Sequence, residues 1–249
     1  MMRSSLIRAA WIAAFVSISA SISFTRAAAE TKWNSEGFLY TWLYGVDGTI
    51  AAGDATSGFP VEASVDDIAG YKDFSIAGHF ESKTAKAILL ADVQYLNLGA
   101  ERDFDLPSGV TRGELDFTHW TFEAGGGYRL SENVDLLGVA RYYALQTSST
   151  LGQNTVSDQD RSWMDVFVGG RYSARSGKWR SSVRVDVGTG GSDFAWFGNV
   201  MIGYSLSERV SLGLGYRVLS VDYETGENAN YFRYDVVQDG LGLALGLDF

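Results

Sequence analysis

The chain has no cysteine, only two prolines among its 249 residues, and no long apolar run beyond its N-terminus. The absence of cysteine excludes a disulfide scaffold and a zinc site built from thiolates. The absence of runs of about 18 apolar residues excludes a protein built from several membrane-spanning helices. Aromatic residues, in contrast, make up 14% of the chain, which excludes an intrinsically disordered protein.

Basic residues are scarce relative to acidic ones. The chain has 20 Lys and Arg against 30 Asp and Glu, for a formal net charge of −10. Such a chain repels polyanions, so nucleic acid is not expected as a partner.

The N-terminus has the three parts of a secretory signal peptide. Arg3 and Arg8 precede an uncharged, mostly apolar segment over 9–24, and Ala27–Ala29 offers a small-residue cleavage site. The apolar segment is shorter than the ~20 residues that span a bilayer. We therefore expect 1–29 to be a cleaved signal peptide and 30–249 to be a domain that works outside the cytoplasm.

Alternation of apolar and polar residues with period two dominates the rest of the chain and predicts an all-β fold. Ten long strands are expected, although eight stay possible if two of them are loop hairpins. Their ranges are 36–52, 73–82, 86–98, 112–130, 133–148, 161–175, 178–191, 194–206, 209–223 and 230–249.

The connections between these strands alternate in length. Short turns at 83–85, 131–132, 176–177 and 207–208 alternate with longer connections at 53–72, 99–111, 149–160 and 224–229, and 192–193 is a short exception. A meander with tight turns at one end and long loops at the other is typical of closed antiparallel outer-membrane β-barrels.

Alternation alone does not say which face of the strands is inside, and a soluble ligand-binding barrel would show the same period. The export signal and the terminal Phe249 on an alternating apolar strand favour a transmembrane barrel, with Phe249 as a signal for the outer-membrane assembly machinery. Aromatic residues toward strand ends are also expected to form interface girdles. These residues are Trp42, Trp120, Tyr128, Trp163, Tyr172, Trp179, Trp196, Tyr204 and Tyr216.

The whole mature chain resembles bacterial outer-membrane β-barrel proteins. Three early segments, Val61–Ile68, Phe74–Glu81 and Ala91–Leu96, resemble an uncharacterised group of small barrels, as do the later segments Gly169–Tyr172, Ser192–Trp196 and Gly215–Arg217. This resemblance implies a fold and a place in the outer membrane of a Gram-negative bacterium, with outer-membrane lipid as a partner, and implies no activity.

Projected inward, the strands give a polar lumen in which acids and bases interleave, because an unpaired charge in a narrow lumen is costly. The expected ladder comprises Glu81, Asp92, Glu123, Asp135, Asp165 and Asp186 with Arg129, Arg141, Arg171, Arg180, Arg184 and Arg217. A ten-stranded barrel lies close to the size at which side chains fill the interior. A narrow channel and a structural or surface-interaction protein are both compatible with this lumen.

Catalytic chemistry has little support in the sequence. His79 and His119 are expected on the lumen face as hydrogen-bonded residues, since no nucleophile motif accompanies either. An enzyme acting on lipid or peptide at the barrel rim is the alternative. No catalytic residue, metal site or cofactor is predicted.

The 53–72 connection is the least ordinary segment. Ser64 with Asp67 is typical of a helix start, so Val65, Asp66, Asp67 and Ile68 predict a short helical turn that could plug or cover the barrel mouth. Acidic residues in this and other loops leave a small solute or a divalent cation as a possible partner.

Overall fold

The computed structural model describes residues 32–52, 59–63, 74–106, 109–151 and 154–249, and Trp33–Phe249 forms one compact unit. The unit is all-β apart from a single 3₁₀ turn, η1 (Asn228–Asn230). Its strands are β1 (Asn34–Ala52), β2 (Phe59–Ala63), β3 (Phe74–Lys83), β4 (Ala87–Leu106), β5 (Gly109–Arg129), β6 (Val134–Leu151), β7 (Asn154–Ser176), β8 (Trp179–Gly190), β9 (Phe194–Ser205), β10 (Val210–Thr225) and β11 (Phe232–Asp248).

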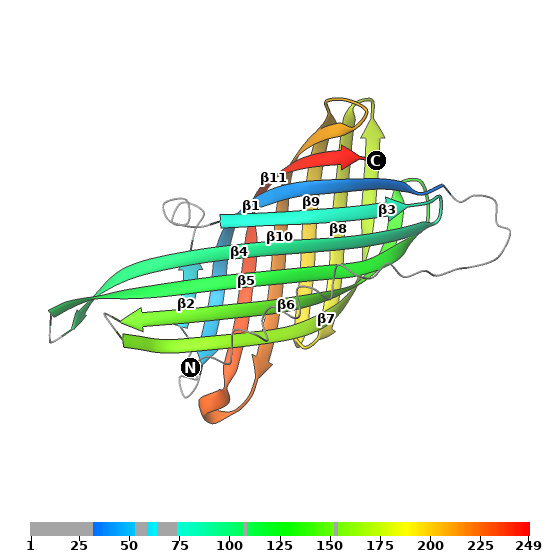
Figure 1. Cartoon of the computed structure of the whole chain (residues 1–249). Helices are drawn as coiled ribbons and strands as arrows, with labels where there is room; N and C mark the ends of the chain where they lie inside the picture. The colour runs from blue at the N-terminus through cyan, green and yellow to red at the C-terminus, as the bar shows by residue number, and fades with distance from the viewer. Residues whose placement is uncertain (1–31, 53–58, 64–73, 107–108, 152–153) are drawn as a thin grey trace, which may run out of the picture. The chain divides into compact units, whose positions relative to one another are not determined.

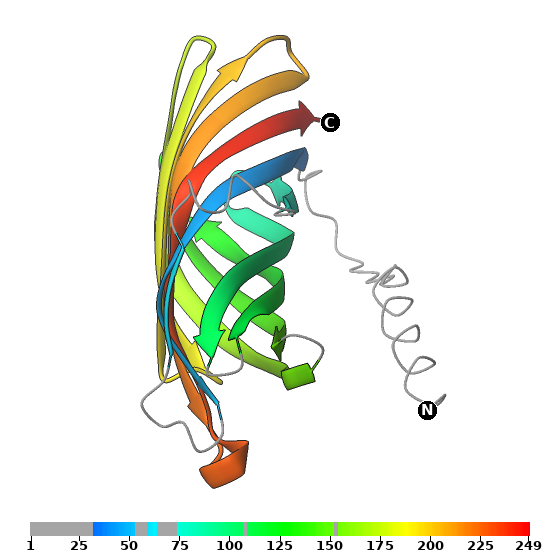
Figure 2. The ribbon, with the colours of Figure 1, turned by 90° about the vertical axis from the view of Figure 1, so that its left-hand side faces the viewer.

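Ten long strands close into an antiparallel barrel. Each strand from β3 to β11 pairs with its neighbour in sequence, β1 pairs with β3, and β11 returns to pair with β1 from Glu36↔Asp248 to Ala52↔Phe232. Figure 2 shows β11 and β1 side by side along this closure. The predicted fold class and the count of ten strands are confirmed.

Strands on opposite walls cross steeply, as Figure 1 shows for β3–β6 against β8–β10. Closing a sheet into a barrel requires tilted strands, typically by about 35–45°, so opposite walls must cross. Short connections gather at one end, called here the turn end, at 84–86, 130–133, 177–178 and 206–209. The other end is called the loop end.

The loops predicted at 99–111 and 149–160 are wrong, because most of their residues belong to strands. Residues 99–106 continue β4 and 109–111 begin β5, and these strands stay paired up to Leu106↔Gly109. Likewise, 149–151 and 154–160 belong to the paired strands β6 and β7, with one register shift at Ser149/Thr150. The polar composition of these segments suggested loops, but the pairing of a hairpin rests on backbone hydrogen bonds and does not need an apolar face.

The 53–72 connection also differs from expectation, because Phe59–Ala63 forms the short strand β2. β2 pairs with the loop-end part of β1, from Val46↔Ala63 to Ile50↔Phe59, whereas β3 pairs with the turn-end part, from Asn34 to Tyr40. The helical turn and the plug predicted at Val65, Asp66, Asp67 and Ile68 lie outside the described residues.

At the loop end the long hairpins extend past the short β8–β9 hairpin. β8 meets β7 only up to Asp165↔Gly190, so the part of β7 from Asn154 to Met164 has β6 as its partner among the described strands. β4–β7 on one side and β10, β11, β1 and β2 on the other therefore continue as two walls, called here the extension.

An apolar band covers the outside of the barrel. On β7, for example, Met164, Val166 and Val168 are 55%, 61% and 56% exposed, while the alternating residues Asp165 and Phe167 are buried. Exposed Leu, Val, Ile and Phe side chains recur on every long strand. A continuous exposed surface of this kind would be unstable in water and matches the lipid-facing belt of membrane barrels. The soluble-barrel alternative is therefore not supported.

The aromatic girdle is only partly as predicted. Trp120, Tyr128, Tyr172, Trp179, Trp196 and Tyr216 are among the exposed large side chains on the outer face. Trp42 and Trp163, however, are 5% and 6% exposed and lie inside the barrel. Their neighbours Leu43 and Met164 are the outward residues, so the strand period would have excluded both from the girdle.

Within the described residues, no helix is long and apolar enough to cross a membrane.

Candidate functional site: a charged cavity beneath an aromatic layer

A cavity of about 840 Å³ occupies the lumen at the turn end. Its mouth is bordered by Ser35, Asn133 and Asp248, all at the turn end, and its deeper wall includes Glu123, Arg141 and Arg217. This volume falls within the ~300–1,000 Å³ of typical small-molecule sites.

Glycines on the inner face of the β9–β11 wall leave room for this cavity. Gly203, Gly213 and Gly242 line the cavity, and glycines place no side chain in it. A Cβ on Gly242 would clash with the ring of Trp42, so the indole lies directly against the β11 backbone. The missing side chains on this wall therefore leave space for the cavity and for the ring of Trp42.

Glu81 organises one group of charges on the cavity wall. Its carboxylate accepts two hydrogen bonds from Arg171, at 2.5 and 2.9 Å, and lies 3.0 Å from the ammonium group of Lys83. Arg171 also donates to Asp135 at 2.8 Å, and Arg129 lies 3.5 Å from the same carboxylate. The bonds between Arg171 and Glu81 join β7 to β3 across the barrel, because these strands are not neighbours in the sheet.

Glu123 organises a second group, deeper in the barrel. Arg141 donates to it from Nε at 2.9 Å, and Arg184 lies 2.9 Å from its other oxygen and 2.7 Å from Asp186. Arg141 and Glu123 are 2% and 6% exposed, so this is a buried ion pair with most of its hydrogen-bonding groups satisfied by partners. Removing one member would leave a buried charge without compensation.

Asp92 has partners of another kind. Tyr40 donates to its carboxylate at 2.7 Å, Gln94 donates at 2.9 Å, and His79 Nδ1 lies 3.0 Å away. No arginine is within ion-pairing distance of Asp92 in the described part of the chain. Asp92 therefore joins the network through neutral groups and a histidine, which differs from the expected acid–base ladder.

Asp165 is also placed differently from expectation. Its two oxygens accept hydrogen bonds from the backbone N–H and the hydroxyl of Ser192, at 2.8 and 2.6 Å. It thus closes the turn between β8 and β9. Hydrogen bonds from a turn satisfy this buried carboxylate, and no base is needed.

The charge network includes three residues that the predicted ladder lacks, namely Glu36, Lys83 and Asp248. Arg180 pairs with Glu36 at 3.3 Å and with Asp248 at 2.5 Å, and Lys83 pairs with Glu36 at 2.7 Å. Glu36, Lys83 and Asp248 stand at strand ends close to the mouth. The period-two pattern that places Tyr40 and Trp42 inside would also have placed Glu36 inside.

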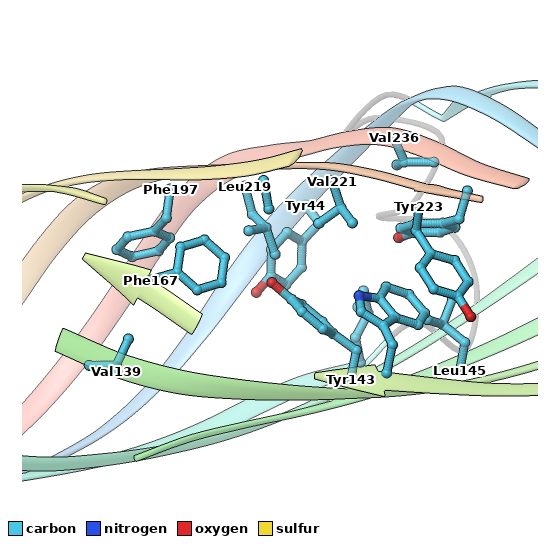
Figure 3. Close-up of a cluster of buried hydrophobic side chains, with 14 of the residues drawn as sticks. Tyr44, Val139, Tyr143, Leu145, Phe167, Phe197, Leu219, Val221, Tyr223 and Val236 are labelled. Atoms are coloured by element: carbon cyan, nitrogen blue, oxygen red, sulfur yellow. The ribbon is translucent and has the colours of Figure 1, made fainter. Parts of the chain in front are cut away.

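An aromatic layer lies in the lumen on the loop side of these charges. It consists of Tyr143 (β6), Trp163 (β7), Tyr223 (β10), and Phe232 and Tyr234 (β11), which are all 8% exposed or less. Ring centroids lie 4.9 Å apart for Tyr143–Trp163 and 4.2 Å for Trp163–Tyr223. Figure 3 shows Tyr143 and Leu145 on one side of the barrel interior and Tyr223 on the other. The layer connects the two walls of the extension.

The two histidines have different surroundings in the lumen. His79 contacts Asp92 and lies 3.9 Å from Glu81, while His119 contacts Thr121 at 3.2 Å and Gln238 at 3.4 Å. His119 is buried beside Tyr143. The described hydrogen bonds of both histidines thus go to groups of the lumen wall. In the same residues, no cluster of three or more acidic or histidine side chains is arranged to hold a metal ion.

Phe249 ends the chain beside β1. Its backbone N–H donates to the carbonyl of Ser35 at 2.9 Å, and its side chain is 79% exposed. The ring is thus accessible at the turn end, as a recognition signal would have to be.

Similar solved structures are bacterial barrels. They include Ail, the attachment invasion locus protein of Yersinia pestis (11% identity, 88% of this chain and 99% of that chain, TM-score 0.39). Neisserial surface protein A is 13% identical, with 87% of this chain and 97% of that chain covered and a TM-score of 0.34. An outer membrane channel from Pseudomonas putida F1 is 14% identical, with 89% of this chain and 97% of that chain covered and a TM-score of 0.39. No family model and no curated protein matches the chain. At these identities, the closed strand order and the apolar exterior are what identify a membrane barrel.

Proposed function

We propose that this protein is an outer-membrane barrel with a sealed lumen, which serves as a structural or surface-interaction protein and not as a diffusion pore. The aromatic layer carries this proposal. Its stacked rings join β6 and β7 to β10 and β11 across the lumen, and all five side chains are almost fully buried. An aqueous path along the barrel axis would have to pass through this packed layer.

The lengths of the connections between strands indicate the orientation of the barrel in the membrane. Bacterial membrane barrels have short periplasmic turns and longer extracellular connections. The turn end and its cavity therefore face the periplasm, and the extension projects from the cell surface. Residues 1–29 are removed on export, Phe249 directs insertion by the assembly machinery, and outer-membrane lipid covers the apolar band.

The extension suits a surface role. It is built from strands that rise past the β8–β9 hairpin and carry alternating polar residues, and it is held together inside by the aromatic layer. A sheet that stands above the membrane offers a surface to other molecules. A role as a non-enzymatic protein agrees with the partners of the two histidines.

Conductance in planar bilayers tests the sealed lumen. The refolded mature chain should be electrically silent across a KCl gradient. Replacing Trp163 and Tyr223 by alanine should produce discrete steps, because the variant removes the closest stacked pair. Tyr142→Ala is the matched control, since Tyr142 neighbours Tyr143 on β6 but points outward with 41% exposure. Discrete steps from the unmodified chain would overturn the proposal in favour of the narrow channel.

A further inference from the structure

Arg217 is a buried cation without a carboxylate partner in the described structure. It lies on the inner face of β10, opposite Asn199 and Gly240, with 3% exposure, and it lines the cavity. Its Nε has no hydrogen-bond partner. The nearby Asp92 does not fill this role, because Tyr40, His79 and Gln94 occupy its oxygens.

Arg217 is one of three arginines that lie around a single aromatic ring. The guanidinium groups of Arg141, Arg184 and Arg217 lie 4.7, 5.1 and 5.0 Å from the centroid of the Phe197 ring. Glu123 pairs with Arg141 and Arg184, and Asp186 pairs with Arg184. Among the described residues, Arg217 has no carboxylate at ion-pairing distance. Buried charges are ordinarily compensated, so an external anion would complete this group.

A second donor without a partner stands beside Arg217. The guanidinium carbon lies 5.9 Å from the centroid of the Trp42 ring, and the indole Nε1 of Trp42 is buried with no acceptor. Trp42 also lines the cavity. The planar guanidinium group of Arg217 matches the two oxygens of a carboxylate, and the Trp42 ring lies beside it.

Apolar contacts are also available in this cavity. Phe38, Phe197 and Met201 line the same cavity, and the glycine-rich wall of β10 and β11 faces them. The mouth carries Glu36 and Asp248 as well as Arg180, which disfavours entry of a multiply charged anion. The cavity thus offers a position for a monoanion next to apolar side chains.

We propose that the cavity binds a small organic carboxylate from the periplasmic side. Its carboxylate accepts hydrogen bonds from the guanidinium group of Arg217 beside the Trp42 ring, and its apolar body lies against Phe197 and Met201. Binding requires no passage through the aromatic layer, so this inference and the sealed lumen can fail independently.

The test is a titration of the refolded, ¹⁵N-tryptophan-labelled barrel in zwitterionic detergent micelles, observed by NMR. Benzoate is the probe, and inorganic phosphate is the competing anion. The indole N–H signal of Trp42, assigned through Trp42→Phe, should shift saturably with benzoate, while that of Trp163 in the aromatic layer should stay in place. Arg217→Gln should weaken benzoate binding at least tenfold, and phosphate should bind more weakly than benzoate.

Two further variants separate binding from folding. Gly203→Leu should also abolish the shift, because a Cβ at Gly203 meets only ordinary contacts while the longer side chain fills the cavity. Thr121→Val, on the inner face but outside the cavity lining, should bind like the parent. Retained heat-modifiable migration on gels shows that each variant is folded. The absence of a saturable Trp42 shift, equal affinity in Arg217→Gln, or tighter binding of phosphate than of benzoate would overturn the proposal.

Discussion

Two buried cations in the same lumen illustrate how context sets the energetic role of a residue. Arg141 shares Glu123 with Arg184, whereas Arg217 contacts the Phe197 ring and has no carboxylate within ion-pairing distance among the described residues. Truncating one member of a buried pair leaves the other charge uncompensated, at a cost of ~3–5 kcal/mol. Replacing an unpaired buried charge by an apolar group removes a cost that the fold already bears.

We therefore predict opposite effects for two substitutions. Glu123→Gln should lower the free energy of unfolding by ~3–5 kcal/mol, because Arg141 and Arg184 lose their shared carboxylate. Arg217→Met should leave the free energy of unfolding unchanged or raise it. Urea titration of tryptophan fluorescence in detergent micelles measures both. Equal losses would mean that Arg217 has a compensating partner after all.

At the scale of the strand, the long hairpins show that pairing and membrane embedding are separate properties. β4 and β5 stay in register from Ala87↔Tyr128 to Leu106↔Gly109, but their exposed apolar residues, such as Leu89 and Phe122, lie toward the turn end. The distal part of the hairpin is held by backbone hydrogen bonds between two polar strands. An isolated two-stranded ribbon of this kind is marginally stable by itself.

Shortening this hairpin should therefore be tolerated. Deleting residues 101–114 and joining the strands through an Asn-Gly turn removes the distal pairs and keeps Leu96 and Phe117, which are buried in the core. We expect heat-modifiable migration to persist and the free energy of unfolding to change by less than ~1 kcal/mol, since exposed loop tips tolerate such changes. Failure of the shortened chain to refold would show that the distal hairpin contributes to the barrel.

At the scale of the whole molecule, the barrel has apolar surface on both its outside and part of its inside. Aromatic and aliphatic side chains fill the loop-end interior, and Leu, Val and Ile side chains cover the exterior of the turn-end half. Only a bilayer around the exterior makes this distribution stable, since water would have to solvate a continuous apolar belt. The energetic effect of an outward charge should therefore depend on its depth.

A depth series on β7 tests this. Val168→Arg lies in the middle of the exposed apolar run and should cost ~2–4 kcal/mol, whereas Ser162→Arg, outward on the same strand beyond Met164, should cost ~0–1 kcal/mol. Unfolding from lipid vesicles, followed by tryptophan fluorescence, measures the difference. Equal costs at the two depths would contradict a lipid-facing belt.

The strand period determined most of this architecture from the sequence alone. Alternation in segments such as 163–174 assigned each residue to one of two faces, because successive side chains of a strand point to opposite sides. That rule is enough for the ten strands and for the inward position of the twelve predicted charges. The same period places Trp42 and Trp163 inward, against the girdle expected for them. It could not locate the ends of β4–β7, since a solvated hairpin and a loop have similar compositions.

Only the tertiary structure decided which residues meet across the lumen. Arg171 on β7 reaches Glu81 on β3, while Asp165 pairs with the Ser192 turn and Arg217 stays without a carboxylate. These pairings depend on the closure of β11 on β1 and on strand stagger, which set the height of each residue on opposite walls. Sequence determines the face of a strand because that property is local. The contacts across the lumen depend on how all ten strands are arranged together.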